Sequence, residues 1–331
     1  MQLTQKKSRR GDLLTAAAVA MLLAVMAALL YTGSLTRQMT NMLIPTAVYI
    51  VMAVSLNLVV GLLGELSLGH AGFMSVGLFS GCLVAIALTN TALPLMVRLP
   101  VSMLAGGLTA AVFGLLVGLP TLRLRGDYLA IVTLACGEII KNIITNLRVT
   151  GGALGLNTSA IYAGAKELLP YGAALVLLTV AVMLNLKRSK YGRAIMAIRD
   201  NRIAAESVGL SVTRYKLAVF VIAAFFAGCA GVLYGHSLAN IKAAAFDYNM
   251  SIEILVIVVL GGMGSVPGSV VSAIVLTVLP EALREVADYR MLVYAVVLIL
   301  VMQATNNPAM KRFFGAACKS LTSKRKERAA L

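Results

Sequence analysis

Long runs without a charged residue recur along the whole chain and constrain its fold more than any other feature. Eight such runs extend over residues 13–36, 38–64, 66–97, 99–122, 168–186, 217–241, 254–280 and 291–310. Residues 128–147 are also apolar, apart from Glu138 and Lys141. A helix needs about 20 residues to cross the hydrocarbon layer of a bilayer, and each of these stretches supplies that length. The sequence therefore predicts an all-α polytopic membrane protein.

Composition and charge exclude the main alternative classes. Of the 331 residues, 60% are hydrophobic and 13% are charged, which is more apolar side chain than a soluble fold could bury. The net charge of +16 would suggest nucleic acid as a partner, but 19 of the 29 basic residues lie in three segments that flank apolar runs. Such segments stay in the cytoplasm and attract anionic headgroups. We therefore expect membrane lipids, and no nucleic acid, to provide the negative charge opposite these basic segments.

The reactive side chains indicate no catalytic or metal centre and no bound cofactor. The cysteines and histidines are widely separated in sequence: Cys82, Cys136, Cys229, Cys318, His70 and His236. Cysteines placed in this way are typical of small apolar fillers in a protein without disulfides. The chain also has no phosphate-binding loop that ends in Gly-Lys-Ser/Thr. We therefore expect a protein that is not an enzyme and does not hydrolyse ATP itself.

The basic segments also predict the topology. With residues 1–12 in the cytoplasm and an uncleaved first span, six crossings return the chain to the cytoplasm at Lys187. Nine crossings would leave the basic tail, residues 311–331, outside. Glycine and proline interrupt the run 254–280, so we expect two short helices around a break. They form either a re-entrant hairpin, giving eight crossings, or two crossings, giving ten, and the membrane domain covers residues 13–310 in both cases.

One long polar segment, residues 187–216, interrupts the apolar chain and carries eight basic residues against two acidic ones. We call it the basic segment. Apolar residues at three- and four-residue spacings within it predict a short amphipathic helix over residues 201–208, after an earlier turn at 193–198. Asp200 is the candidate N-cap and Gly209 the candidate C-terminal stop. The segment is interpreted as a cytoplasmic docking loop, and a solvated loop that faces lipid headgroups is the alternative.

Two glycine-rich clusters lie in opposite halves of the chain, at residues 61–77 and 261–268. Glycine-interrupted apolar segments in the two halves point to a conduction path at membrane depth. The alternative is that glycines only allow helices to approach closely. We favour this alternative for the three G-x-x-x-G pairs, Gly77/Gly81, Gly114/Gly118 and Gly231/Gly235.

Ionisable side chains inside a span are costly and are candidates for function. Glu138, Lys141 and Asn142 share one helical face, where they either line the path or form a neutralised structural pair. The segment 150–157, expected outside, is a gate, a receptor contact or an ordinary connecting loop. The candidate path residues are Glu65, His70, Glu138, Asn142, Gly261, Gly262 and Gly264.

Five stretches resemble the M-type permease subunit of branched-chain amino acid ABC importers. They are SLNLVVGLLGELSLGHAGFMSVG from Ser55, RGDYLAIVTLACGEII from Arg125, TGGALGL from Thr150, YGRAIMAIRDNRIAAESVGLSVTRYKLAVFVIAAFFAGCAGVLYGH from Tyr191 and IEILVIVVLGGMGSVPGS from Ile252. The resemblance covers well over half of residues 55–269, in the family's order. It implies an inner-membrane subunit that pairs with an H-type permease, two cytoplasmic ATPases and a periplasmic binding protein.

The resemblance also implies a coupling helix that docks on an ATPase. The general loop motif of ABC importers begins Glu-Ala-Ala and ends in Gly, whereas this chain has Ala204-Ala205-Glu206 followed by Gly209, a departure that is usual for this subfamily. The residues that this assigns to coupling are Arg199, Asp200, Arg202, Ala204, Ala205, Glu206 and Gly209.

The expected function is import of branched-chain or related hydrophobic amino acids, driven by ATP that the partners hydrolyse. A permease for urea or short amides is the alternative within the same group of importers. From a different class, an ion-coupled secondary transporter could use Glu138 and Lys141 as a relay. A membrane enzyme would need a cluster of reactive side chains, which the sequence does not offer.

Overall fold

The computed structural model describes residues 2–33, 36–89, 94–124 and 126–282, together with residues 296 and 299. The α-helices are α1 Gln2–Tyr31, α2 Arg37–Asn57, α3 His70–Thr89, α4 Leu95–Thr121, α5 Asp127–Asn146, α6 Ala165–Arg188, α7 Lys190–Asp200, α8 Arg202–Ser207, α9 Val212–His236, α10 Tyr248–Gly261 and α11 Val266–Ala282. The short elements are the π-helix η1 Leu58–Leu63, the 3-10 helices η2 Gly152–Leu154, η3 Ser159–Ile161 and η4 Ala243–Ala245, and the strands β1 Leu156–Asn157 and β2 Asn240–Ile241.

Seven helical segments of the described chain are long and apolar enough to cross a membrane. They are Arg37–Leu63, His70–Thr89, Leu95–Thr121, Asp127–Asn146, Ala165–Arg188, Val212–His236 and Ala243–Gly261. Two shorter apolar helices, Thr15–Tyr31 and Val266–Glu281, add to them. These segments confirm the predicted all-α polytopic fold. The last predicted span, residues 291–310, and the basic tail, residues 311–331, lie outside the described residues apart from positions 296 and 299.

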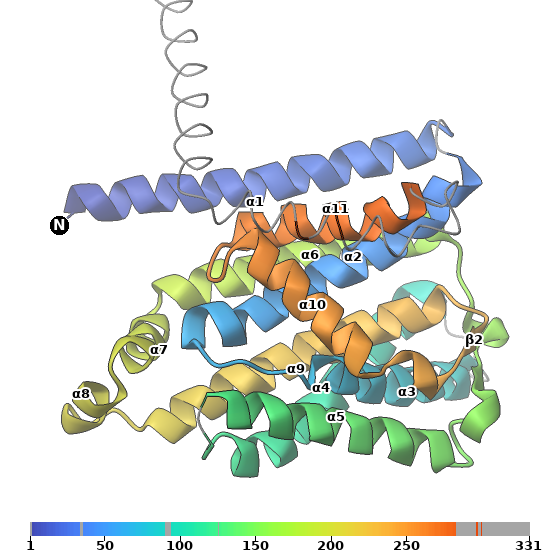
Figure 1. The fold of residues 1–331 in the computed structure, drawn as a ribbon. Helices are drawn as coiled ribbons and strands as arrows, with labels where there is room; N and C mark the ends of the chain where they lie inside the picture. The colour runs from blue at the N-terminus through green and yellow to red at the C-terminus, as the bar shows by residue number, and fades with distance from the viewer. Residues whose placement is uncertain are drawn as a thin grey trace, which may run out of the picture. The chain divides into compact units, whose positions relative to one another are not determined.

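The apolar run 254–280 folds as two helices, as its glycines predict. α10 ends at Gly261, and α11 begins at Val266 after a turn in which Gly262 and Gly264 have φ values of 87° and 82°. This left-handed region is open to glycine at little cost and strained for other residues. Both helices extend from the turn toward the same side, so the chain reverses direction there (Figure 1). The segment 243–261 is long and apolar enough to cross a membrane, and this length favours two short crossings over a re-entrant hairpin.

Glycines bring α3, α4 and α9 into close contact in the interior of the bundle. A Cβ atom at Gly77 would overlap the backbone of Gly228, and one at Gly231 would overlap the carbonyl of Met74. The other members of the G-x-x-x-G pairs also face neighbouring helices: Gly81 faces Val232 and Ser102, Gly114 faces Ala224, Gly118 faces Leu217, and Gly235 faces Cys82. Small residues let helix backbones approach in this way. The packing interpretation of these three pairs is therefore confirmed.

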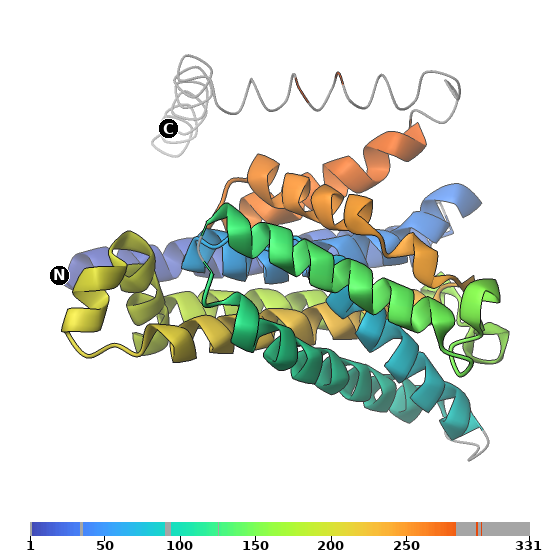
Figure 2. The same ribbon diagram turned by 60° about the horizontal axis from the view of Figure 1, so that its bottom comes forward.

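The polar connections gather at two opposite ends of the bundle. Figure 1 and Figure 2 both show α7 and α8 at one end and the β1–β2 ribbon at the other. In the ribbon, β1 pairs antiparallel with β2, with Leu156 opposite Ile241. Thr158 extends this contact, since its N–H donates to the carbonyl of Ala239 at 2.9 Å. The predicted loop 150–157 is thus bound to the connection that follows α9.

Candidate functional site

The basic segment folds into two helices, each capped by a polar side chain. Ser189 Oγ accepts a hydrogen bond from Gly192 N at 3.0 Å and begins α7, which is a full helix of 11 residues. Asn201 Oδ1 accepts from Ala204 N at 3.1 Å and begins α8. The prediction of Asp200 as the N-cap, after a single turn, was therefore wrong. The side chain of Asp200 instead accepts hydrogen bonds from the guanidinium of Arg199, at 3.0 and 3.1 Å.

α8 ends in a glycine-terminated motif that attaches it to the rest of the segment. Gly209, with φ 85°, donates to the carbonyl of Glu206 at 3.0 Å, and Leu210 N donates to the carbonyl of Ala205 at 3.1 Å. This pair of bonds defines a Schellman motif, which normally carries an apolar contact across the turn. Leu210 packs on the small cluster of Ile198, Ala205 and Val212. Gly209 is confirmed as the stop, and this cluster fixes a helix too short to be stable alone.

The opposite face of α8 is exposed and mixed in character. Ile203 and Val208 are each 80% exposed, and Ala204 also lies on the surface. Arg202 Nε pairs with Glu206 Oε1 at 2.8 Å across one turn of this face. α8 therefore presents two large apolar side chains to its surroundings beside an exposed ion pair.

The two glycine clusters meet in space. We call residues 58–69 the first break and residues 262–265 the second break. A Cβ atom at Gly61, in the first break, would overlap both the side chain of Asn57 and the backbone nitrogen of Gly264. Glycine is therefore required at position 61 because two backbones touch there. The remaining glycines of the first cluster pack on helices: a Cβ at Gly69 or Gly72 would press on the α5 backbone.

Asn57 joins the two breaks by three hydrogen bonds. Its carboxamide nitrogen donates to Ser265 O at 3.2 Å and to Ser269 Oγ at 2.9 Å. Its oxygen accepts from Gly264 N at 2.7 Å. The residue is fully buried, at 0% exposure. A buried carboxamide is costly unless its polar atoms are paired, and here every partner belongs to the second break or the first turn of α11.

Three basic side chains of the basic segment bind the breaks. Arg199 Nη1 donates to Gly61 O at 3.1 Å, and Lys187 Nζ donates to Gly264 O at 3.0 Å. Lys216 forms a buried ion pair with Glu65. Carbonyl groups freed where a helix breaks need new donors, and cations are favoured at helix C-termini. The basic segment therefore holds the first break at two places and the second at one.

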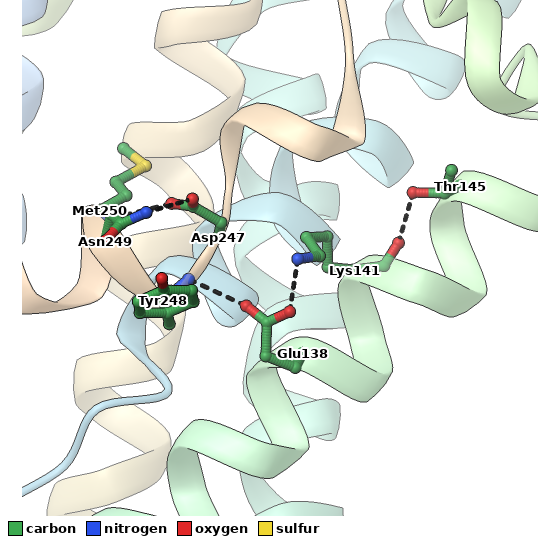
Figure 3. Close-up of polar contacts among 7 residues, drawn as sticks. All are labelled: Glu138, Lys141, Thr145, Asp247, Tyr248, Asn249 and Met250. Atoms are coloured by element: carbon green, nitrogen blue, oxygen red, sulfur yellow. Dashed lines mark hydrogen bonds and ion pairs between the residues drawn. The ribbon is translucent and has the colours of Figure 1, made fainter.

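A separate polar group lies between α5 and α10 (Figure 3). Glu138 pairs with Lys141 through one carboxylate oxygen, and its other oxygen accepts from Tyr248 N at 2.9 Å. Tyr248 is the first residue of α10, and Asp247 Oδ1 caps this helix by accepting from Met250 N at 3.1 Å. A carboxylate at a helix N-terminus is stabilised by the helix dipole. Glu138 is thus paired with Lys141 and also fixes the start of α10 against α5.

A packing gap too narrow for a water molecule lies beside this group. Its lining residues are Leu68, Gly72, Leu134, Gly137, Glu138, Phe246, Asp247, Tyr248 and Ser251. The Glu138 side chain is 27% exposed, and Asn142, one helical turn further along α5, lies on the surface. The α5–α10 face therefore presents polar groups within segments long and apolar enough to span a membrane.

The structure divides the predicted path residues into groups. Glu65 and Gly264 lie where the basic segment meets the breaks, and Gly261 and Gly262 precede Gly264 by three and two positions. Glu138 and Asn142 belong to the α5–α10 face. His70 belongs to neither contact: it is buried, and its Nε2 bonds Ser55 Oγ at 2.8 Å.

Sequence reasoning missed Asn57, and it did not assign roles to Lys187 and Lys216. Asn57 is neutral and lies in the run 38–64, which has no charged residue to draw attention to it, whereas Asn142 lies beside Glu138 and Lys141. A search for any amide within four residues of a glycine cluster would have found it, since Asn57 precedes Gly61 by one helical turn. The two lysines were counted only as topology signals because their partners are distant in sequence.

Comparison with known proteins gives a consistent set of relatives. Residues 38–302 match the family described as branched-chain amino acid transport system / permease component. The high-affinity branched-chain amino acid transport system permease protein LivM of Salmonella typhimurium is 36% identical over 296 residues, and LivM of Escherichia coli is 37% identical over 290 residues. Each alignment covers 78% of this chain and 66% of the relative.

A second type of permease matches more weakly. The high-affinity branched-chain amino acid transport system permease protein LivH of Salmonella typhimurium is 31% identical over 126 residues, which cover 37% of this chain and 40% of LivH. No solved structure matches the chain.

Proposed function

Since the chain belongs to the family of branched-chain amino acid transport permeases, we propose that it is a transmembrane subunit of an ATP-driven importer. Its substrate would be a branched-chain or related hydrophobic amino acid, as the names of its relatives suggest. ATP hydrolysis would belong to partner subunits. The observation that carries the proposal is the basic segment, which exposes Ile203 and Val208 on α8 and binds both helix breaks through Arg199 and Lys187.

The proposed complex contains an H-type permease, two cytoplasmic ATPases and a periplasmic binding protein, all in or at the inner membrane. The similarity to LivH supports a second permease. The α5–α10 face supports it too, because Glu138, Asn142 and Asp247 would be costly to expose to lipid. We place the substrate path along this face, between the two permeases. The α7–α8 end, with both chain termini, would lie in the cytoplasm.

The proposed cycle follows from these contacts. A loaded binding protein docks at the end that carries the β1–β2 ribbon, and ATPase closure displaces α7 and α8 at the other end. Arg199 and Lys187 transmit the displacement to the breaks, so the path opens on alternate sides. A partner can shift this equilibrium only through contacts that differ between the two states, and α8 is where such contacts are available.

Reconstitution tests the proposal. The chain, its second permease, the ATPases and the binding protein are placed in proteoliposomes, and uptake of radiolabelled leucine is measured. Uptake is expected to require ATP and both soluble partners, with labelled urea giving no uptake above background. Leucine accumulation driven by an ion gradient without the ATPases would instead support a secondary transporter. Uptake of urea without uptake of leucine would instead support a permease for urea or short amides.

The exposed face of α8 should contribute to the affinity for the ATPases. Ile203→Asp places a charge at the centre of an apolar contact, so association of the ATPases with solubilised permease is expected to weaken about tenfold, an effect of ~1.4 kcal/mol. Leu154→Asp is the matched control, because Leu154 is 83% exposed at the opposite end. Co-purification of the subunits measures both. Wild-type association of the Ile203→Asp variant would show that the ATPases bind elsewhere.

The C-terminal stop of α8 should matter for coupling. A Cβ atom at Gly209 would meet nothing within 4 Å, so Gly209→Val acts only on the backbone: valine either keeps the left-handed φ of 85° at a cost of about 1–2 kcal/mol or leaves it and breaks the turn. Import per ATP hydrolysed is expected to fall several-fold while insertion into the membrane stays normal. Gly164→Val, at a helix start with equally open space, should change neither quantity. If Gly209→Val imported as much substrate per ATP hydrolysed as the wild type, α8 would have no part in coupling.

A further inference from the structure

We infer that the Asn57 side chain is a clasp that holds the two breaks together and keeps the cytoplasmic end of the path closed until the basic segment moves. Asn57 is then a positioning residue for transport: it touches no substrate and sets whether the breaks are joined or apart. This inference rests on the proposed function, because a closed end is meaningful only in a transporter.

The hydrogen bonds of Asn57 connect the two halves of the chain and do little for α2 itself. All three bonds reach residues at least 207 positions away along the chain, in the turn before α11 and its first helical turn. Two of them bind backbone atoms of the second break, at Ser265 O and Gly264 N. A carboxamide can donate and accept at once, so one side chain fixes the break in both distance and orientation.

The contact that Asn57 maintains is tight. Gly61 has no room for a Cβ atom because the backbone of Gly264 lies against it. Gly264 lies close from its own side as well, since a Cβ there would be 3.5 Å from Gly61 O. The second break directly follows α10, so it lies at the α7–α8 end of the proposed path along the α5–α10 face. We call the contact between the two breaks the seal: while it holds, the breaks cannot separate to open that end of the path.

Two side chains that flank most of α7 bind opposite sides of this seal. Lys187, at the end of α6, binds Gly264 O in the second break at 3.0 Å. Arg199, at the end of α7, binds Gly61 O in the first break at 3.1 Å, and its alkyl chain covers Gly64. Any motion of α7 that changes the distance between Lys187 and Arg199 pulls the two breaks relative to each other. The bonds of Asn57 oppose that separation.

The first experiment removes the clasp in the assembled complex. Asn57→Leu keeps a similar volume and loses all three hydrogen bonds. Basal ATP hydrolysis without binding protein is expected to rise about fivefold, and import per ATP to fall by a similar factor. Thr46→Val is the matched control: Thr46 is buried in the same helix, but its hydroxyl bonds only Met42 O within α2. Hydrolysis and import at wild-type levels in Asn57→Leu would overturn the inference.

A labelling measurement keeps the test decisive if Asn57→Leu fails to assemble. Val266, the first residue of α11, is buried beside the second break and bonds nothing through its side chain. In a background without the native cysteines, the thiol of Val266→Cys should react with a small maleimide at least fivefold faster in the ATP- and vanadate-trapped complex than at rest. Equal rates in the two states would mean that the breaks stay joined during transport.

The two proposals fail in different ways. If the proposed function is wrong, the wild-type complex imports no leucine under any condition. If only the clasp is wrong, the wild type imports leucine while Asn57→Leu behaves like Thr46→Val and the labelling rate of Val266→Cys does not change with nucleotide.

Discussion

Lys216→Met is expected to destabilise the protein more than any other single change at the basic segment, by about 3–5 kcal/mol. The Lys216 and Glu65 side chains are only 4% and 14% exposed, so removing the ammonium leaves a carboxylate buried without its counter-charge. The cost comes mainly from that uncompensated charge. Unfolding of the purified protein in mixed detergent micelles, followed by circular dichroism over an SDS titration, measures it.

A double substitution separates the charge effect from simple loss of packing. Glu65→Gln together with Lys216→Met removes both charges, and it is expected to recover most of the lost stability. Arg202→Met is the exposed control, because the Arg202 and Glu206 side chains are 32% and 47% exposed. It should cost less than about 1 kcal/mol. A double variant as unstable as Lys216→Met alone would show that the lysine acts through its contacts and not through its charge.

Gly61→Val should reduce import at least tenfold, which is the largest functional loss expected from a single residue. The new side chain would occupy the space of Asn57 Oδ1 and Gly264 N, so the two breaks must move apart or α2 must shift. Overpacking of this kind costs roughly 1–3 kcal/mol in stability. Leucine uptake by the reconstituted complex gives the first effect, and thermal unfolding gives the second.

The control for Gly61→Val is the same substitution where space is available. Gly164 has open space on its Cβ side and an ordinary backbone conformation, so Gly164→Val should import at the wild-type rate. If Gly61→Val also imported at that rate, the contact between the two breaks would have no part in transport.

Local signals in the sequence were sufficient to find the basic segment and its end. Its charge and the position of Gly209 predicted a short helix with a defined stop, because a Schellman motif depends on a few adjacent residues. The N-cap was misplaced by one residue. Asp200 and Asn201 are both good caps by type, and only the path of the backbone after α7 decides that Asn201 faces the free N–H groups.

Contacts between distant residues were predicted only in part. The pairing of Glu138 with Lys141 follows from their spacing along one helix, whereas the bond from Tyr248 to Glu138 spans 110 residues. The contacts of the glycines were likewise predicted only in part. Sequence spacing suggested close helix packing for the G-x-x-x-G pairs, but it could not show that Gly61 rests on Gly264 while Gly69 and Gly72 rest on α5.

The sequence alone determined the all-α membrane fold, most segments able to span within the described residues, the two helix interruptions and the basic segment. Each of these depends on hydropathy, charge or backbone freedom over a short stretch, and those properties follow from residues that are adjacent in the sequence. The tertiary structure alone decided that the two breaks touch, that Asn57 joins them, and that Arg199, Lys187 and Lys216 bind them. A hydrogen bond is directional and acts over about 3 Å, so its partners are known only once the helices are packed.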